Sequence, residues 1–152
     1  MDDEHAASVL RRIVQLERDR LFLFDAAIGG VKEDDLRRML QEMRADHEAN
    51  LGQLESAMRE RAASPPETES LHGLRLESGV AAASIVGDDD VVERVAASEL
   101  EAIDAYDQAV SDESLGEALR VRLRDQVEEE RRHRQWMTEW LAVHEPSPPP
   151  DS

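Results

Sequence analysis

The stretch LRDQVEEERRHRQWMTEWL, residues 123–141, decides the fold because it sets charged residues on an apolar helix face. Its apolar residues recur at the three- and four-residue spacing that marks one face of an α-helix. Glu130 and His133 lie on that face, since residues three apart project from the same side of a helix. A buried charge is costly unless it has a partner. The rest of the chain must therefore supply partners for this Glu-x-x-His pair.

Three earlier segments carry the same helical period, and each has a polar residue on its apolar stripe. They span about residues 4–28, 33–62 and 91–110, and the stretch above belongs to a fourth helix of about residues 113–144. The polar residues are Glu17, His47 and Glu99, and each follows an apolar residue of its own stripe by four positions. The sequence thus predicts an all-α chain with a polar position near the middle of every long helix.

The links between these helices differ in length. Gly29 and Gly30 end the first helix and leave only a short turn before the second. Two prolines follow the second helix, which they cannot continue, and roughly 25 residues separate it from the third. Residues 70–86 of this crossover are rich in small side chains and are predicted to be helical despite Gly73. A short link, a long crossover and a short link form the connectivity of ferritin-like four-helix bundles.

The polar positions are predicted to meet at the middle of the bundle. Short links bring residues at equal distances from the link to similar heights, at a rise of about 1.5 Å per residue. By that measure the candidate metal ligands are Glu17, His47, Glu99, Glu130 and His133. The chain has no cysteine, and carboxylates with imidazoles suit iron, manganese or zinc.

On these residues the chain resembles the ferritin-like superfamily, which includes the rubrerythrins and bacterioferritins, and it is similar to bacterial members of unknown function. The likeness covers most of residues 5–143 and rests on three short motifs: Arg44-x2-His47-x3-Leu51, Glu99-x3-Ile103-x2-Tyr106 and Gln126-x3-Glu130-x2-His133. The superfamily's site takes a Glu from each of two helices and a Glu-x-x-His motif from each of the other two. The resemblance therefore implies Glu17 and Glu99 as the lone carboxylates around one or two iron ions, with manganese or zinc as alternatives. It also implies iron storage, oxidation, or defence against peroxide or other stress.

Arg44 stands three residues before His47, where that pattern has a glutamate. If Arg44 points inward, its guanidinium pairs with a carboxylate and takes the place of a cation. The chain is then a non-catalytic, metal-free structural or stress-related bundle. If Arg44 reaches out to solvent, three carboxylates and two histidines remain for metal. The sequence leaves both interpretations open, and with them the question of enzymatic activity. Asp46 and Glu48 flank the stripe and are expected in solvent.

Composition narrows the classes of partner. The net charge of −17 argues against nucleic acid and against anionic membrane surfaces. No segment has the roughly 20 apolar residues of a membrane span, and the acidic N-terminus is unlike a signal peptide. We expect a cytoplasmic homodimer whose other partners are metal ions, with Trp136 and Trp140 at the end of the core or at a subunit contact. Residues 1–145 are predicted to form the bundle and the proline-rich residues 146–152 a disordered tail.

Overall fold

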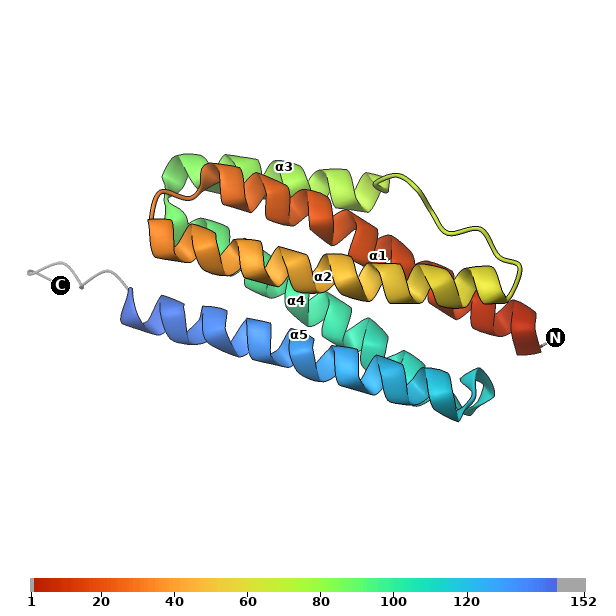
Figure 1. The fold of residues 1–152 in the computed structure, drawn as a ribbon. Helices are drawn as coiled ribbons and strands as arrows, with labels where there is room; N and C mark the ends of the chain where they lie inside the picture. The colour runs from red at the N-terminus through yellow and green to blue at the C-terminus, as the bar shows by residue number, and fades with distance from the viewer. Residues whose placement is uncertain (1, 145–152) are drawn as a thin grey trace, which may run out of the picture.

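The computed structural model describes residues 2–144, and in this part of the chain the fold is all-α, as predicted, with no strand (Figure 1). The helices are α1 (Asp2–Gly30), α2 (Asp34–Glu60), α3 (Leu71–Val86), α4 (Asp88–Val110) and α5 (Glu117–Val143), with one 3₁₀ turn, η1 (Glu113–Leu115). No helix within residues 2–144 is both long and apolar enough to cross a membrane. The predicted tail, residues 146–152, lies outside the described residues.

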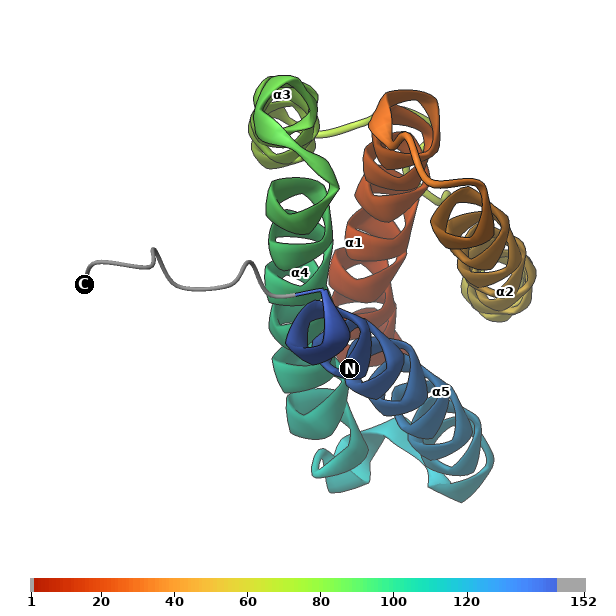
Figure 2. The ribbon, with the colours of Figure 1, turned by 90° about the vertical axis from the view of Figure 1, so that its left-hand side faces the viewer.

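The helices form a bundle in which neighbours along the chain run antiparallel. α2 returns along α1 after a short link, and α5 returns along α4 after η1 (Figure 1). α1 packs against α2, α3 and α4, whereas α5 packs against α4 (Figure 2). The four long helices α1, α2, α4 and α5 therefore enclose a common interior, and α3 lies on the outside of α1 and α4.

The crossover contains the predicted helix, and its start is fixed on α1. The backbone N–H of Ser70 donates to Asp19 Oδ1 at 2.8 Å, and the Ser70 hydroxyl caps α3 by accepting from the N–H of Gly73. A Cβ added at Gly73 would lie 2.5 Å from Asp19 Cγ, so only glycine lets α3 approach α1 this closely. The glycine that interrupts the helical pattern in the sequence is thus what allows the helix to dock.

The helix bounds differ from the predicted ones by a few residues. α1 continues through both glycines to Gly30, α2 ends at Glu60, and α5 begins only at Glu117, after η1. The acidic run of residues 88–90 forms the first turn of α4, where carboxylates interact favourably with the positive end of the helix dipole. These differences leave the predicted order of elements unchanged.

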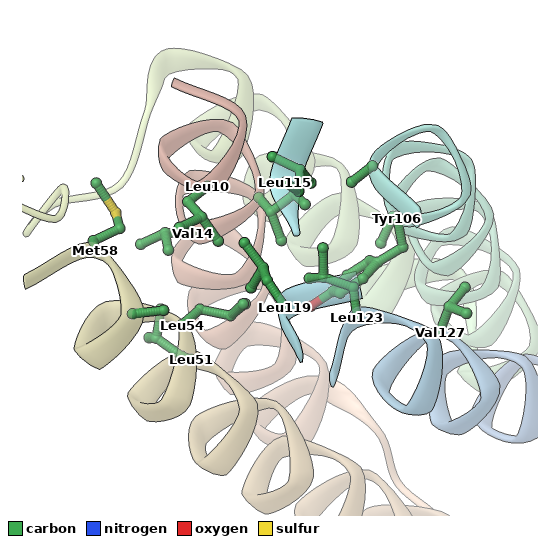
Figure 3. Packing of buried hydrophobic residues seen from close by; sticks show 14 of the residues in the cluster. Leu10, Val14, Leu51, Leu54, Met58, Tyr106, Leu115, Leu119, Leu123 and Val127 are labelled. Atoms are coloured by element: carbon green, nitrogen blue, oxygen red, sulfur yellow. The ribbon is translucent and has the colours of Figure 1, made fainter. Parts of the chain in front are cut away.

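Two apolar clusters make the core, one toward each end of the bundle. Figure 3 shows the first, in which side chains from α1, α2, α4, η1 and α5 meet. Its labelled members include Leu10, Leu51, Leu54, Tyr106, Leu123 and Val127. The second cluster contains Phe24, Leu36, Leu40, Val92, Val95, Met137 and Trp140. On α2, α4 and α5 the two clusters are separated by residues 44–50, 97–101 and 128–136, and these segments carry buried polar residues. On α1 the clusters meet at Leu21 and Leu23, and the buried Glu17 and Arg20 lie just before that point.

Candidate metal centre

A layer of buried polar side chains lies between the two apolar clusters. It contains all five residues that the sequence singled out: Glu17 from α1, His47 from α2, Glu99 from α4, and Glu130 and His133 from α5. His133 is the most exposed of them, at 8%. The predicted convergence of these side chains at the middle of the bundle is therefore what the structure shows. Their role as metal ligands stays a prediction.

His47 is at the hub of this layer. Its Nδ1 lies 2.7 Å from Glu17 Oε2 and 3.2 Å from Glu130 Oε1, and its Nε2 lies 3.0 Å from Glu99 Oε1. The Phe24 ring packs beside the imidazole with the two ring centroids 5.0 Å apart. Three helices thus aim carboxylates at one imidazole that comes from the fourth.

Arg20 enters the same layer from α1, and the sequence analysis missed it. Its Nη2 lies 2.6 Å from Glu99 Oε1 and 3.9 Å from Glu130 Oε2, and its Nη1 donates to the carbonyl oxygen of Ser98. The side chain is 3% exposed. The signal was present in the sequence, because Arg20 follows Glu17 by three positions and so shares its helix face. Arginine side chains are mostly exposed, so Arg20 was not considered for the layer, although its spacing from Glu17 places it on the buried face.

Arg44 does not enter the layer, which corrects the interpretation that it replaces the metal. Its Nε lies 2.6 Å from Asp25 Oδ1 and its Nη1 lies 3.0 Å from Glu48 Oε2, both at the surface. The side chain of Arg44 is 30% exposed. The long arginine side chain reaches outward to two exposed carboxylates, where it keeps its hydration. Among residues 2–144, the arginine that the structure places at the centre is Arg20.

The protonation states of the layer follow from burial and from these contacts. Burial would lower the pKa of His47, but the carboxylates of Glu17 and Glu99 raise it to about 9. Burial would likewise raise the pKa of Glu17 and of Glu99, but the charges of His47 and Arg20 lower both overall. Burial raises the pKa of Glu130 well above its ordinary value, and the charges of Glu99 and Glu17 raise it further.

Without a metal, the charges of the layer therefore balance. Arg20 and protonated His47 face ionised Glu17 and Glu99, and Glu130 carries a proton that it can share with a neighbouring carboxylate. The Tyr106 hydroxyl donates to Glu17 Oε1 at 3.2 Å. A buried set of charges is tolerable only when it is paired in this way.

His133 is held from the outside by a residue that we expected in solvent. Its Nε2 lies 2.9 Å from Asp46 Oδ2, and its Nδ1 is buried without a hydrogen-bond partner. The imidazole rings of His133 and His47 are 5.3 Å apart, centroid to centroid. A histidine that donates one N–H to a carboxylate and keeps the other nitrogen free is the usual state of a metal ligand. Asp46 therefore orients His133 although it flanks the apolar stripe.

Four side chains of the layer have ligand atoms that could surround a single ion. One donor atom each from His47, Glu99, Glu130 and His133 lies within 4.8 Å of all the others. Several polar atoms of this group are buried without a hydrogen-bond partner among the described residues, namely Glu99 Oε2, both carboxylate oxygens of Glu130 and His133 Nδ1. Such atoms are rare in native interiors. The donor set and its unpaired atoms fit a divalent ion of the iron, manganese or zinc type. Glu17 is outside this group, although it also contacts His47, at Nδ1.

Comparison with protein families matches residues 5–112 to the family described as Domain of unknown function (DUF2383). This range covers α1 to α4 and includes Glu17, Arg20, His47 and Glu99. Neither the curated proteins nor the solved structures contain a match to the chain.

Proposed function

We propose that this chain, which belongs to the DUF2383 family, binds one divalent metal ion in its buried polar layer. The observation that carries the proposal is the group of four donors, His47, Glu99, Glu130 and His133, with its buried unpaired atoms. These four residues are the ligands. Glu17 holds His47 through Nδ1 and Asp46 holds His133 through Nε2, so each histidine ligand has its own orienting carboxylate.

Charge balance supports a single ion rather than two. A ligating His47 must lose its proton, and so must Glu130. The ion then brings two positive charges in place of two protons, and the total charge of the layer does not change. Arg20 remains as the fixed cation against Glu99 and Glu130. A second ion would add charge that no further buried carboxylate of the layer can balance.

The fold supports an assignment to the ferritin-like class. We propose that α1, α2, α4 and α5 form a ferritin-like four-helix bundle, in which residues 61–70 and α3 are the long crossover. We propose iron as the ion, with manganese or zinc as alternatives, and bound Fe(II) would supply electrons to oxygen or peroxide. The role that we propose for the chain is accordingly iron binding for storage, oxidation or stress defence. The protein contributes a dry site, two oriented imidazoles and a permanent positive charge.

The direct test is a calorimetric titration of metal-free protein with Co²⁺ near pH 7. We expect one ion per chain, with close to two protons released for each ion, measured by repeating the titration in buffers of different ionisation enthalpy. The affinity should rise with pH, because the ion competes with the protons on His47 and Glu130. Binding of two ions per chain, or binding without proton release, would contradict the charge exchange.

A second candidate function rests on Arg20. Because Arg20 and protonated His47 already balance the charges of Glu17 and Glu99, the layer also has no net charge as a metal-free ion-pair centre. The chain would then be a structural or stress-related bundle without metal chemistry. In this candidate function Arg20 of α1 takes the role that the sequence analysis gave to Arg44 of α2. Metal content separates it from the first candidate.

The metal-free protein should lose stability as the pH rises from about 6.5 to 9. The pKa of His47 is raised to about 9 in the folded chain, so its protonation stabilises the fold fully below pH 6.5 and no longer above 9. The raised pKa of Glu130 acts in the same direction. We expect a decrease of about 3 kcal/mol in the free energy of unfolding. Urea denaturation in a chelator at pH 6.5, 7.5 and 9 measures it, and an increase over this range would count against the assigned protonation states.

A further inference from the structure

The interface between α2 and α5 is a polar seam. Three side-chain pairs cross it in antiparallel register: Asp46 with His133, Asn50 with Glu129, and Gln53 with Gln126. The Asn50 amide donates to Glu129 Oε1 at 2.8 Å. In each pair one member is buried and the other is at least partly exposed. The seam therefore places polar groups between solvent and the buried layer.

The other helix contacts around the layer are closer. α1 packs along α2 and α4 packs along α5, whereas α2 and α5 share few close backbone approaches and meet through long side chains. An ion that entered between tightly packed apolar side chains would have to lose its hydration shell without replacement. At the seam, polar atoms of the protein can replace the water molecules of the ion's hydration shell one at a time.

At the level of the buried polar layer, the seam contains a second group of possible metal ligands. Donor atoms of Asp46, Glu129 and His133 lie within 4.8 Å of one another. The side chain of Asp46 is 47% exposed, and Glu129 is partly buried and held by Asn50. His133 belongs to both groups, and it is more than nine-tenths buried with an unpaired Nδ1. One imidazole thus stands between a solvent-facing carboxylate pair and His47 in the interior.

We propose that Asp46, Glu129 and His133 form a transient uptake site through which the divalent ion reaches the centre. The ion binds first to the two carboxylates at the mouth of the seam and to His133. The ion then moves past His133 and binds to Glu99 and Glu130 in the centre. The uptake site is then free again to bind another ion from solvent. This inference rests on the proposed function, because it supplies the route to the site proposed there. The net charge of −17 raises the local concentration of cations at the surface, and the seam selects among them by its imidazole.

Glu129→Gln tests the route by kinetics. Glu129 is not one of the four ligands of the centre, and its hydrogen bond is to Asn50. The substitution therefore removes an uptake ligand and leaves the four ligands of the centre in place. We expect Co²⁺ uptake by metal-free protein, followed by stopped-flow absorption, to slow by about tenfold, since loss of one metal-orienting carboxylate commonly lowers local affinity by 10–100-fold. Release to a chelator should slow equally, and the equilibrium content of one ion per chain should not change.

The matched control is Glu128→Gln. Glu128 is the neighbouring residue on α5, carries the same charge and is 56% exposed beside Arg131. Its uptake rate should stay within twofold of the wild type, which separates a local role of Glu129 from the general attraction of an acidic surface. Equal rates in the two variants would overturn the uptake site. Loss of equilibrium metal in Glu129→Gln would also overturn it, because Glu129 would then be part of the centre.

A third variant keeps this proposal separate from the proposed function. In Glu130→Gln the centre is disabled while Asp46, Glu129 and His133 remain. Mn²⁺ should still broaden the backbone amide signals around these three residues in NMR spectra, at concentrations well above those that load the intact centre. Uniform broadening over all acidic surfaces would overturn the seam site. Absence of stoichiometric metal from the wild type overturns the proposed function instead, and the uptake role with it, whatever Mn²⁺ does at the seam.

Discussion

Arg20→Met should lower the stability of the metal-free protein by roughly 3–5 kcal/mol, the cost of leaving a buried charge without its partner. The substitution leaves Glu99 and Glu130 facing only His47, and it leaves the Ser98 carbonyl oxygen without its donor. For a chain of this length such a loss corresponds to a melting temperature lower by roughly 10 °C or more. Methionine fills similar space, so the loss measures the charge and not a cavity.

Arg44→Met is the matched control for this change. It removes the same charge and a similar length of side chain from a surface ion pair with Asp25 and Glu48. Exposed pairs contribute about 0–1 kcal/mol, so its melting temperature should stay within a few degrees of the wild type. Calorimetric melting of both variants in a chelator measures the two effects. A larger loss in Arg44→Met than in Arg20→Met would reverse the assignment of the central cation.

Glu130→Gln should abolish tight metal binding and leave the fold intact. In the metal-free layer Glu130 carries a proton, and a glutamine amide reproduces the size and neutrality of that protonated carboxyl. The metal-bound layer needs the carboxylate, which glutamine cannot supply. We expect the affinity for Co²⁺ to fall by at least about a hundredfold, equivalent to about 3 kcal/mol.

The melting temperature of metal-free Glu130→Gln should differ by only a few degrees from that of the wild type, and this makes the variant informative. Lost metal binding then cannot be attributed to unfolding. Wild-type affinity in this variant would remove Glu130 from the ligand set. A collapse of stability without metal would show instead that Glu130 is ionised in the free protein and paired with Arg20.

The sequence predicted most of the fold because the helical pattern of apolar residues continues over long segments. Glycines and prolines mark the links between these segments. The positions of Glu17, His47, Glu99 and Glu130 on the apolar stripes, together with two short links, were enough to place them at one level. Helix ends were less certain, since the glycines that end α1 are also compatible with a further helical turn.

The identity of the buried cation could not be predicted by the same means. Arg20 and Arg44 both lie three residues from a buried polar position, and each has a side chain long enough to point inward or outward. The choice depends on which carboxylates are within reach: Asp25 and Glu48 draw Arg44 to the surface, whereas Arg20 faces Glu99 across α1 and α4. The contacts of Arg44 with Asp25 and of Arg20 with Glu99 are between helices, and sequence spacing within one helix does not contain them.

The polar seam is a second feature that spacing alone could not show. Asp46 lies beside the apolar stripe of α2 and was expected in solvent. In the structure it contacts His133 of α5. The pairing became visible only once the antiparallel register of α2 and α5 was known. In consequence the sequence predicted which five residues meet in the layer, but neither the carboxylate that contacts His133 nor the polar pairs between α2 and α5.

We propose that the layer holds one divalent ion beside the permanent charge of Arg20. The most direct measurement is the ratio of metal to protein, by elemental analysis, in wild-type chain purified without chelator from cells grown with added iron. We predict a ratio close to one, and close to zero for Glu130→Gln prepared in parallel. A wild-type ratio near zero would contradict the claim and leave the metal-free ion-pair centre, and a ratio near two would show that Arg20 does not take the place of a second ion.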